Sequence, residues 1–379
     1  MKSDPLAPAS ASLFEDALKG WGNDDLMLNA QVRKRIKTLY PEINRVLDWP
    51  GLRDVFRHHD KLATAGKRTS RNLGAFAILL GGSGVALLAL VQAVQNMNAI
   101  DHLWVARLSI VTLAMMVVGT LVGIWHWLGM RARDRWLSHR FWTERLRQLH
   151  FQVLVNNIEL AVAAIDSDEK LAELEGVRDK KLAELEMRVE TQSAIRAMLK
   201  DVTERDAWLV PIPSRDIAGV DPARLGQLLE ALEFLRVRVQ LDYVSRAAGE
   251  NIHAPGVRAR LLKTMGDVFT LMVVPVAALG AILYLGASAE SFMWAGALIG
   301  GANALSALGL MARAADDGLQ NSSDAERYEW YAAALEALST RFDNGDAVAK
   351  IDALRELEVL AYQELRRFIG THRRARFLM

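Results

Sequence analysis

The sequence predicts an all-α integral membrane protein with two transmembrane helical hairpins, four spans in all, and long cytoplasmic helices. Three observations predict this class: four long apolar stretches, their grouping into two close pairs, and basic residues that flank each pair. Each stretch is close to the ~20 apolar residues that a helix needs to cross the hydrocarbon core of a bilayer. The stretches lie at roughly 73–97, 105–130, 268–286 and 292–312.

We interpret these stretches as membrane helices because a helix satisfies its own backbone hydrogen bonds in a medium without water. A soluble protein would have to enclose four helices that are apolar on every side, in a chain where 24% of the residues are charged. The first stretch begins too far along the chain to be a cleaved signal peptide. The chain is therefore expected to stay anchored by all four spans.

The orientation of the spans follows from lysine and arginine in their flanks. The two short connectors, NAIDHLW and ASAES, contain neither residue. The other side of both hairpins is basic: Lys67, Arg68, Arg71, Arg131, Arg133, Arg258, Arg260, Lys263 and Arg313 lie there. Both termini and the whole middle region are therefore expected in the cytoplasm.

The order of elements occurs twice along the chain, as helix, span, short turn, span, helix. The first unit covers 1–205 and the second 221–379, with a linker at 206–220. Pro211 and Pro213 mark the linker, because each proline lacks a backbone donor and disfavours helix before its ring.

The cytoplasmic segments show signals of helix starts and stops. Asp221 is predicted to cap a helix that has Pro222 in its first position. Leucines follow at helical spacing, with Val239 closing the stripe: Leu225, Leu228, Leu232 and Leu235. Gly318 is expected to end the helix of the fourth span, and Ser323 with Glu326 to form a capping box for the next. The sequence 343–346, DNGD, predicts a turn.

A charged stretch between the halves contains KLAELE twice, at 170–175 and 181–186. The spacing of eleven residues is close to three helical turns, so both copies present their leucines on one face. We predict a long helix over 167–200 that projects into the cytoplasm. Its leucines pack either against a copy in another subunit or within the same subunit, and the sequence favours neither.

No catalytic, cofactor-binding or metal-binding constellation is expected. The chain has no cysteine, so thiolate sites and disulfides are excluded. His58 and His59 point about 100° apart on a helix, and with Asp60 they are interpreted as a solvated face. The GGSG sequence at 81–84 lies within a span and lacks the lysine of a phosphate loop, so close helix approach is expected. Trp125, His126 and Trp127 are typical of a membrane interface.

Small residues in the spans predict close helix packing, because they allow backbones to approach in lipid. The predicted packing positions are Gly119 and Gly123 in the second span and Gly296, Gly300 and Ala304 in the fourth.

Polar residues in the spans are few and uncharged, which argues against an ion-coupled carrier. Gln92, Gln95, Asn303 and Ser306 are candidate pore-lining residues. For Gln92 and Asn303, hydrogen bonding between helices is the alternative. Four spans do not enclose a wide channel, so a pore requires a homo-oligomer.

The partners expected from charge are lipids rather than nucleic acid. The net charge is only +1, which gives no reason to expect nucleic acid. A basic patch near the C-terminus is predicted to attract anionic lipid head groups: Arg366, Arg367, Arg373, Arg374 and Arg376.

The layout of helices around two close spans resembles the SLATT superfamily, the SMODS- and SLOG-associating two-transmembrane effector domains of bacteria. The stretches that carry the resemblance are 49–56, 136–147, 236–243, 326–331 and 356–364. A tandem pair of such units departs from the usual single unit.

The resemblance implies a bacterial inner-membrane effector in anti-phage defence, which oligomerises and forms a pore or disrupts the membrane when triggered. No nucleotide-sensor domain is evident in the sequence, so the trigger is expected to be a separately encoded sensor or nucleotide-signalling protein, or a ligand. The alternative is a constitutive membrane scaffold that recruits a cytosolic enzyme or sensor. An enzyme is not expected.

Overall fold

The protein is all-helical in the part described by the computed structural model, and no strand occurs there. That part is 23–97, 101–128, 130–188, 191–200, 204–212, 217, 219–249, 254–286 and 288–375. The chain forms two compact units, and each takes segments from both halves of the sequence. The helical body comprises Met1–Ala63, Leu137–Gly249 and Glu326–Gly370, and the apolar unit comprises Thr64–Trp136, Glu250–Ala325 and Thr371–Met379.

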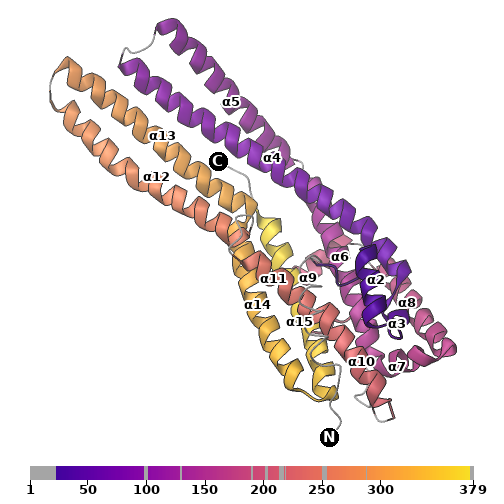
Figure 1. The fold of residues 1–379 in the computed structure, drawn as a ribbon. Helices are drawn as coiled ribbons and strands as arrows, with labels where there is room; N and C mark the ends of the chain where they lie inside the picture. The colour runs from indigo at the N-terminus through magenta and orange to yellow at the C-terminus, as the bar shows by residue number, and fades with distance from the viewer. Residues whose placement is uncertain are drawn as a thin grey trace. The chain divides into compact units, whose positions relative to one another are not determined.

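The apolar unit is built from two hairpins of long helices (Figure 1). α4 (Pro50–Asn96), which enters this unit at Thr64, pairs with α5 (His102–Leu128), and α12 (Pro255–Tyr284) pairs with α13 (Ala289–Leu319). All four helices are long and apolar enough to cross a membrane, as the sequence predicts. Pro275 lies inside α12.

Small residues bring the helices of the apolar unit together. A Cβ placed on Gly119 of α5 would lie 2.5 Å from the backbone nitrogen of Gly81 on α4. One placed on Gly300 of α13 would lie 2.5 Å from the Cβ of Ala93 on α4. Such distances leave no room for a side chain, so glycine is what permits these approaches.

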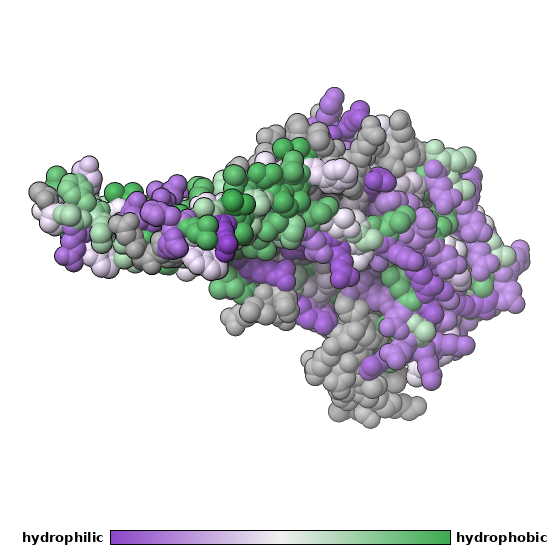
Figure 2. Space-filling model, turned by 90° about the horizontal axis from the view of Figure 1, so that it is seen from above, coloured by the Kyte–Doolittle hydropathy of each residue, from purple (hydrophilic) through white to green (hydrophobic). Residues whose placement is uncertain are grey.

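The outer surface of the apolar unit is formed by large hydrophobic side chains. Leu271 and Val274 of α12 are 74% and 70% exposed, and Ile110 of α5 is 67% exposed. Figure 2 shows hydrophobic residues on the surface of this unit and mostly hydrophilic residues on the surface of the helical body. An exposed apolar surface of this extent marks a membrane or protein contact.

The helical body contains the less apolar helices of both sequence halves. Its elements are α2 (Ala30–Leu39), α3 (Asn44–Leu47), the start of α4, α6 (Met130–Asn156, from Leu137), α7 (Ile158–Asp166), α8 (Asp168–Arg188), α9 (Thr191–Lys200), the 3₁₀ turn η1 (Glu204–Ala207), α10 (Pro222–Leu232), the π-helical η2 (Glu233–Arg238), α11 (Val239–Ala248), α14 (Asn321–Asn344, from Glu326) and α15 (Ala347–Arg374, to Gly370).

Several sequence predictions for the body are confirmed. The side chain of Asp221 accepts a hydrogen bond from the backbone N–H of Ala223 and so caps α10, with Pro222 in the first turn. The predicted stripe that begins at Leu225 is buried through to Val239. The break between α14 and α15 falls at Gly345 and Asp346, the second half of the predicted DNGD turn.

The KLAELE leucines pack within the subunit. Leu174 of α8 is fully buried, and Leu182 and Leu185 belong to the same hydrophobic core. This is the second of the two packing modes that the sequence left open. The other mode, packing against a copy in another subunit, is therefore wrong for the leucines of α8, because the rest of the body covers them.

The predicted boundary after the fourth span is also wrong. α13 continues to Leu319, and Gln320 ends it in the left-handed conformation, with φ 57°. α14 then begins at Asn321, so Ser323 lies inside the helix and cannot cap it. Left-handed conformation is uncommon for a residue other than glycine, which is why the sequence pointed to Gly318 instead.

Candidate functional site

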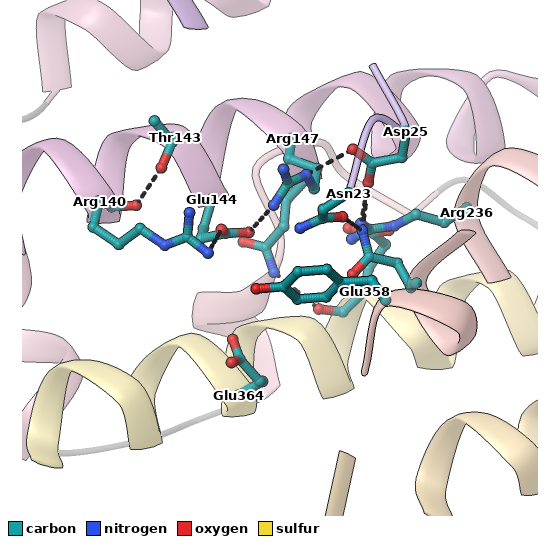
Figure 3. A network of polar contacts seen from close by, with 12 residues as sticks. Asn23, Asp25, Arg140, Thr143, Glu144, Arg147, Arg236, Glu358 and Glu364 are labelled. Atoms are coloured by element: carbon teal, nitrogen blue, oxygen red, sulfur yellow. Dashed lines mark hydrogen bonds and ion pairs between the residues drawn. The ribbon is translucent and has the colours of Figure 1, made fainter. Parts of the chain in front are cut away.

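The main candidate site is a network of charged side chains in the interior of the helical body (Figure 3). Its centre is Asp25, which has no exposed surface. Arg147 of α6 donates from Nε to Asp25 Oδ1 at 2.8 Å, and Arg236 of η2 donates from Nη1 to Oδ2 at 3.1 Å. Gln240 Nε2 is the third donor to this carboxylate and binds Oδ2 at 2.8 Å. One carboxylate thus holds together three separate segments of the chain.

Glu144 extends the network along α6. It accepts from Arg147 Nη1 at 2.6 Å and pairs with Arg140 Nη2 at 2.6 Å. Burial by itself would raise the pKa of Glu144, but the guanidinium groups of Arg140 and Arg147 outweigh it and lower the pKa to about 2. Glu144 is therefore ionised throughout the physiological range.

The other end of the network reaches α15. Arg236 donates from Nε to Glu358 Oε1 at 2.8 Å, and its guanidinium carbon lies 4.7 Å from the centroid of the Phe151 ring. Arg236 and Glu358 are almost fully buried. Burial raises the pKa of Glu358, and Arg236 offsets part of that rise.

The placement of Arg236 depends on the local helix geometry. η2 is a π-helical segment between α10 and α11, and such segments are frequent at functional sites. Residues 231–237 are buried on every side of this helix, so it runs through the centre of the body. A charged side chain in that position requires partners, and Asp25 and Glu358 supply them.

A small recess lies beside the network. Its volume is about 20 Å³, which is enough for about one water molecule. Charged and aromatic side chains line it, among them Arg147, Arg236, Tyr331 and Glu364. One nitrogen of Arg236, Nη2, is buried without a hydrogen-bond partner in the described part of the chain. The recess suits a single polar group rather than a large ligand.

The polar face of α6 also fixes the linker between the sequence halves. Arg145 donates to the backbone carbonyls of Asp206 and Ala207, at 3.1 and 3.2 Å. Gln152 donates to Ala207 O at 2.8 Å and accepts from the backbone N–H of Leu209 at 2.7 Å. The described start of the linker is therefore anchored to the body by side chains.

Two further buried groups lie near this network without belonging to it. Arg178 of α8 donates to the carbonyls of Val46 and Asp48 and lies over the ring of Trp49. The positive charge of Arg178 therefore lies at the C-terminal carbonyls of α3, where a cation is stabilising. His150 is buried with neither ring nitrogen hydrogen-bonded, and burial, reinforced by Arg178, holds its pKa well below the ordinary value. It is neutral at physiological pH.

His59 does not lie on a solvated face, contrary to the prediction from the sequence, because its ring contacts other side chains. Its Nδ1 lies 2.9 Å from Nδ1 of His139, and its ring stacks on Trp142. His58 is exposed, as expected for a surface residue. No group of three metal-ligating side chains occurs in the described part of the chain. The side chains of His126 and Trp127 and the whole of Arg376 lie outside it.

The residues predicted to pack or line a pore occupy different positions in the apolar unit. Gly119 and Gly300 lie at the close approaches to α4, and Ala304 is buried. A Cβ on Gly296 would meet the Asn96 side chain, whereas one on Gly123 would make only ordinary contact with Ala77.

The candidate pore-lining residues are mostly on the surface of the chain. The side chains of Gln92, Gln95 and Asn303 are exposed. Ser306 donates to the carbonyl of Ala302 in its own helix at 3.0 Å. These positions do not define a common lumen within one chain.

The predicted lipid-binding arginines are divided between the two units. Arg366 and Arg367 belong to the helical body, and Arg367 lies over the ring of Trp330 at 3.7 Å. Arg373 and Arg374 belong to the apolar unit and are exposed.

Sequence reasoning missed the ion network as a site, although it used the stretches that form it. Arg147, Arg236 and Glu358 all lie in stretches that carry the family resemblance. The usable signal was charge inside apolar helical stripes, as at Arg236 between Leu235 and Val237. No protein-family model matches this chain, and no curated protein or solved structure matches it either.

Proposed function

We propose that this chain is a multi-pass protein of the bacterial inner membrane with both termini in the cytoplasm. The single observation that carries the proposal is the apolar unit, with four helices of spanning length and large hydrophobic side chains on its outer surface. Such a surface is stable in lipid and prone to aggregation in water. The basic flanks on one side of both hairpins support the orientation.

We further propose that the protein is an effector, which oligomerises and forms a pore or disrupts the membrane when a separately encoded sensor or a ligand acts on it. The resemblance to two-transmembrane effector domains supports this role. So does the absence of charged side chains from the middle of the four apolar stretches, which disfavours an ion-coupled carrier. In this proposal the helical body receives the trigger, and anti-phage defence is the process served.

The effector role is tested by leakage from vesicles. The purified full-length chain is reconstituted at increasing density into vesicles that contain a fluorescent dye. We expect leakage to rise more steeply than linearly with protein density, because high density favours assembly by mass action. Vesicles that stay sealed over the whole range, with the protein inserted, would contradict the effector role.

A constitutive scaffold is the alternative function, and one observation favours it. The recess in the ion network holds only about one water molecule, so the body offers no large ligand cavity there. A scaffold would bind a cytosolic protein on its surface and leave the vesicles sealed. Recovery of one stoichiometric partner from gently solubilised membranes, together with sealed vesicles, would replace the effector proposal by this one.

A further inference from the structure

Asn303 is an unusual residue in the apolar unit. It lies on α13 near the middle of the apolar stretch 292–312, and its side chain is exposed although its neighbours Ala302 and Ala304 are buried. No hydrogen bond to Asn303 occurs in the described part of the chain. Its carboxamide therefore faces outward from the chain with both its donor and its acceptor free.

Three hydroxyl side chains in these helices are satisfied locally. Ser306 donates to Ala302 O at 3.0 Å, Thr270 to Gly266 O at 2.7 Å, and Thr112 to Ser109 O at 2.9 Å. Each hydroxyl uses a carbonyl of its own helix, which is the common solution in a membrane. Asn303 does not use this solution, so it requires a partner from outside the chain.

The membrane itself cannot supply that partner. Transfer of an amide from water to an apolar medium without a hydrogen bond costs roughly 2–7 kcal/mol. Lipid acyl chains have no donors or acceptors. Within the stretch 292–312 the other exposed side chains of α13 are apolar, and Phe292, Ile299 and Leu310 lie on the same face as Asn303. A matching surface must therefore be apolar and carry one donor and one acceptor at the same depth.

We propose that this surface is the same face of α13 in a second copy of the chain. A carboxamide is self-complementary, because its N–H and C=O groups can pair with those of an identical group across a two-fold axis. The apolar side chains around Asn303 then pack against their own counterparts. This inference rests on the proposed membrane insertion and names the partner that starts the assembly.

The test uses the natural absence of cysteine. Ile299→Cys places one thiol on the same face, one helical turn from Asn303, and leaves the carboxamide intact. Two such thiols form a disulfide only if the α-carbons come within about 7 Å. We expect an oxidant to convert Ile299→Cys in native membranes largely into a disulfide-linked dimer. Val117→Cys is the matched control, since Val117 is exposed near the middle of α5 and should yield at least several-fold less dimer.

A second variant tests the role of the carboxamide. In Ile299→Cys with Asn303→Leu, we expect the dimer population to fall roughly three- to thirty-fold, which is the range for one hydrogen bond between membrane helices. Asn303→Gln in the same background should retain more dimer than Asn303→Leu. Equal crosslinking with asparagine and leucine at 303, or crosslinking of Val117→Cys as strong as that of Ile299→Cys, would overturn the inference.

A carbonate wash of the membranes separates this inference from the proposed function. If the protein is washed out, membrane insertion is wrong and the dimer inference is overturned with it. If the protein is retained and Ile299→Cys forms no dimer, the contact through Asn303 alone is wrong.

Discussion

The two units of this protein arrange polar and apolar side chains in opposite ways. In the helical body, Leu174 and Leu228 have no exposed surface, and charged residues form either the surface or a paired internal network. In the apolar unit, the buried face of α13 consists of alanine and glycine, and large residues such as Leu310 lie on its exposed face. The arrangement of the body is the one that the hydrophobic effect produces in water. The arrangement of the apolar unit, with small residues at the helix contacts, is the one expected of helices that associate in lipid.

The largest expected effect comes from the centre of the ion network. Asp25→Asn should lower the free energy of unfolding of the body by about 3–5 kcal/mol, because it leaves the buried Arg147 and Arg236 without their shared carboxylate. The measurement is denaturant unfolding of the full chain in nanodiscs, followed by tryptophan fluorescence.

Glu356→Gln is the matched control for a surface pair. Glu356 pairs with Arg341, and both side chains are about half exposed. Such pairs contribute at most about 1 kcal/mol. Equal losses of unfolding free energy in the two variants would show that the buried ion pairs stabilise the body no more than a surface pair does.

The next effect is a dependence of stability on pH. The pKa of Glu144 is about 2 in the folded chain, against an ordinary value of 4.5. As the pH falls below about 4.5, the unfolded chain binds this proton first, so stability that is present above this pH is lost on the way to pH 2. The shift corresponds to about 3 kcal/mol. Unfolding curves at several pH values should show this loss for the native chain and a much smaller one for Glu144→Gln. If the free energy of unfolding falls with pH equally in both proteins, Glu144 is not the group responsible.

A smaller effect is expected from one methyl group in the apolar unit. Gly119→Ala places a Cβ against the backbone of Gly81 and should destabilise the packing of α4 and α5 by about 1–3 kcal/mol. Gly301→Ala is the control, because a Cβ there meets nothing within 4 Å. That variant should be neutral or slightly stabilising, since alanine favours helix over glycine.

Thermal unfolding in detergent compares the two glycine variants. A stable Gly119→Ala protein, or equal losses in both variants, would show that the close approach to Gly81 does not hold α4 and α5 together.

The features predicted from the sequence are those that depend on local patterns. The four apolar stretches coincide with most of the apolar parts of α4, α5, α12 and α13, because hydropathy over about 20 residues is a local property. The cap at Asp221 and the stripe from Leu225 are equally local. The leucines of α8 were identified as a buried face, but the sequence did not show which partner covers them.

The ion network could not be predicted, because it joins residues that are far apart in the chain. Asp25 is more than 200 positions from Arg236, and nothing in the local sequence of either residue identifies the other. Arg236 also lies in a π-helical segment, which departs from the 3.6-residue period used to assign faces. His59 and His139 are 80 positions apart and were missed for the same reason. Gln320 adopts a conformation that its residue type does not indicate.

Thiol labelling from one side of the membrane tests most directly whether the apolar unit spans it. Ser288→Cys places the only thiol in the connector before α13, and Met187→Cys places it on the exposed surface of α8. In intact spheroplasts, a membrane-impermeant thiol reagent should label Ser288→Cys and should label Met187→Cys only after lysis. Labelling of Met187→Cys in intact spheroplasts, or of Ser288→Cys only after lysis, would contradict the account.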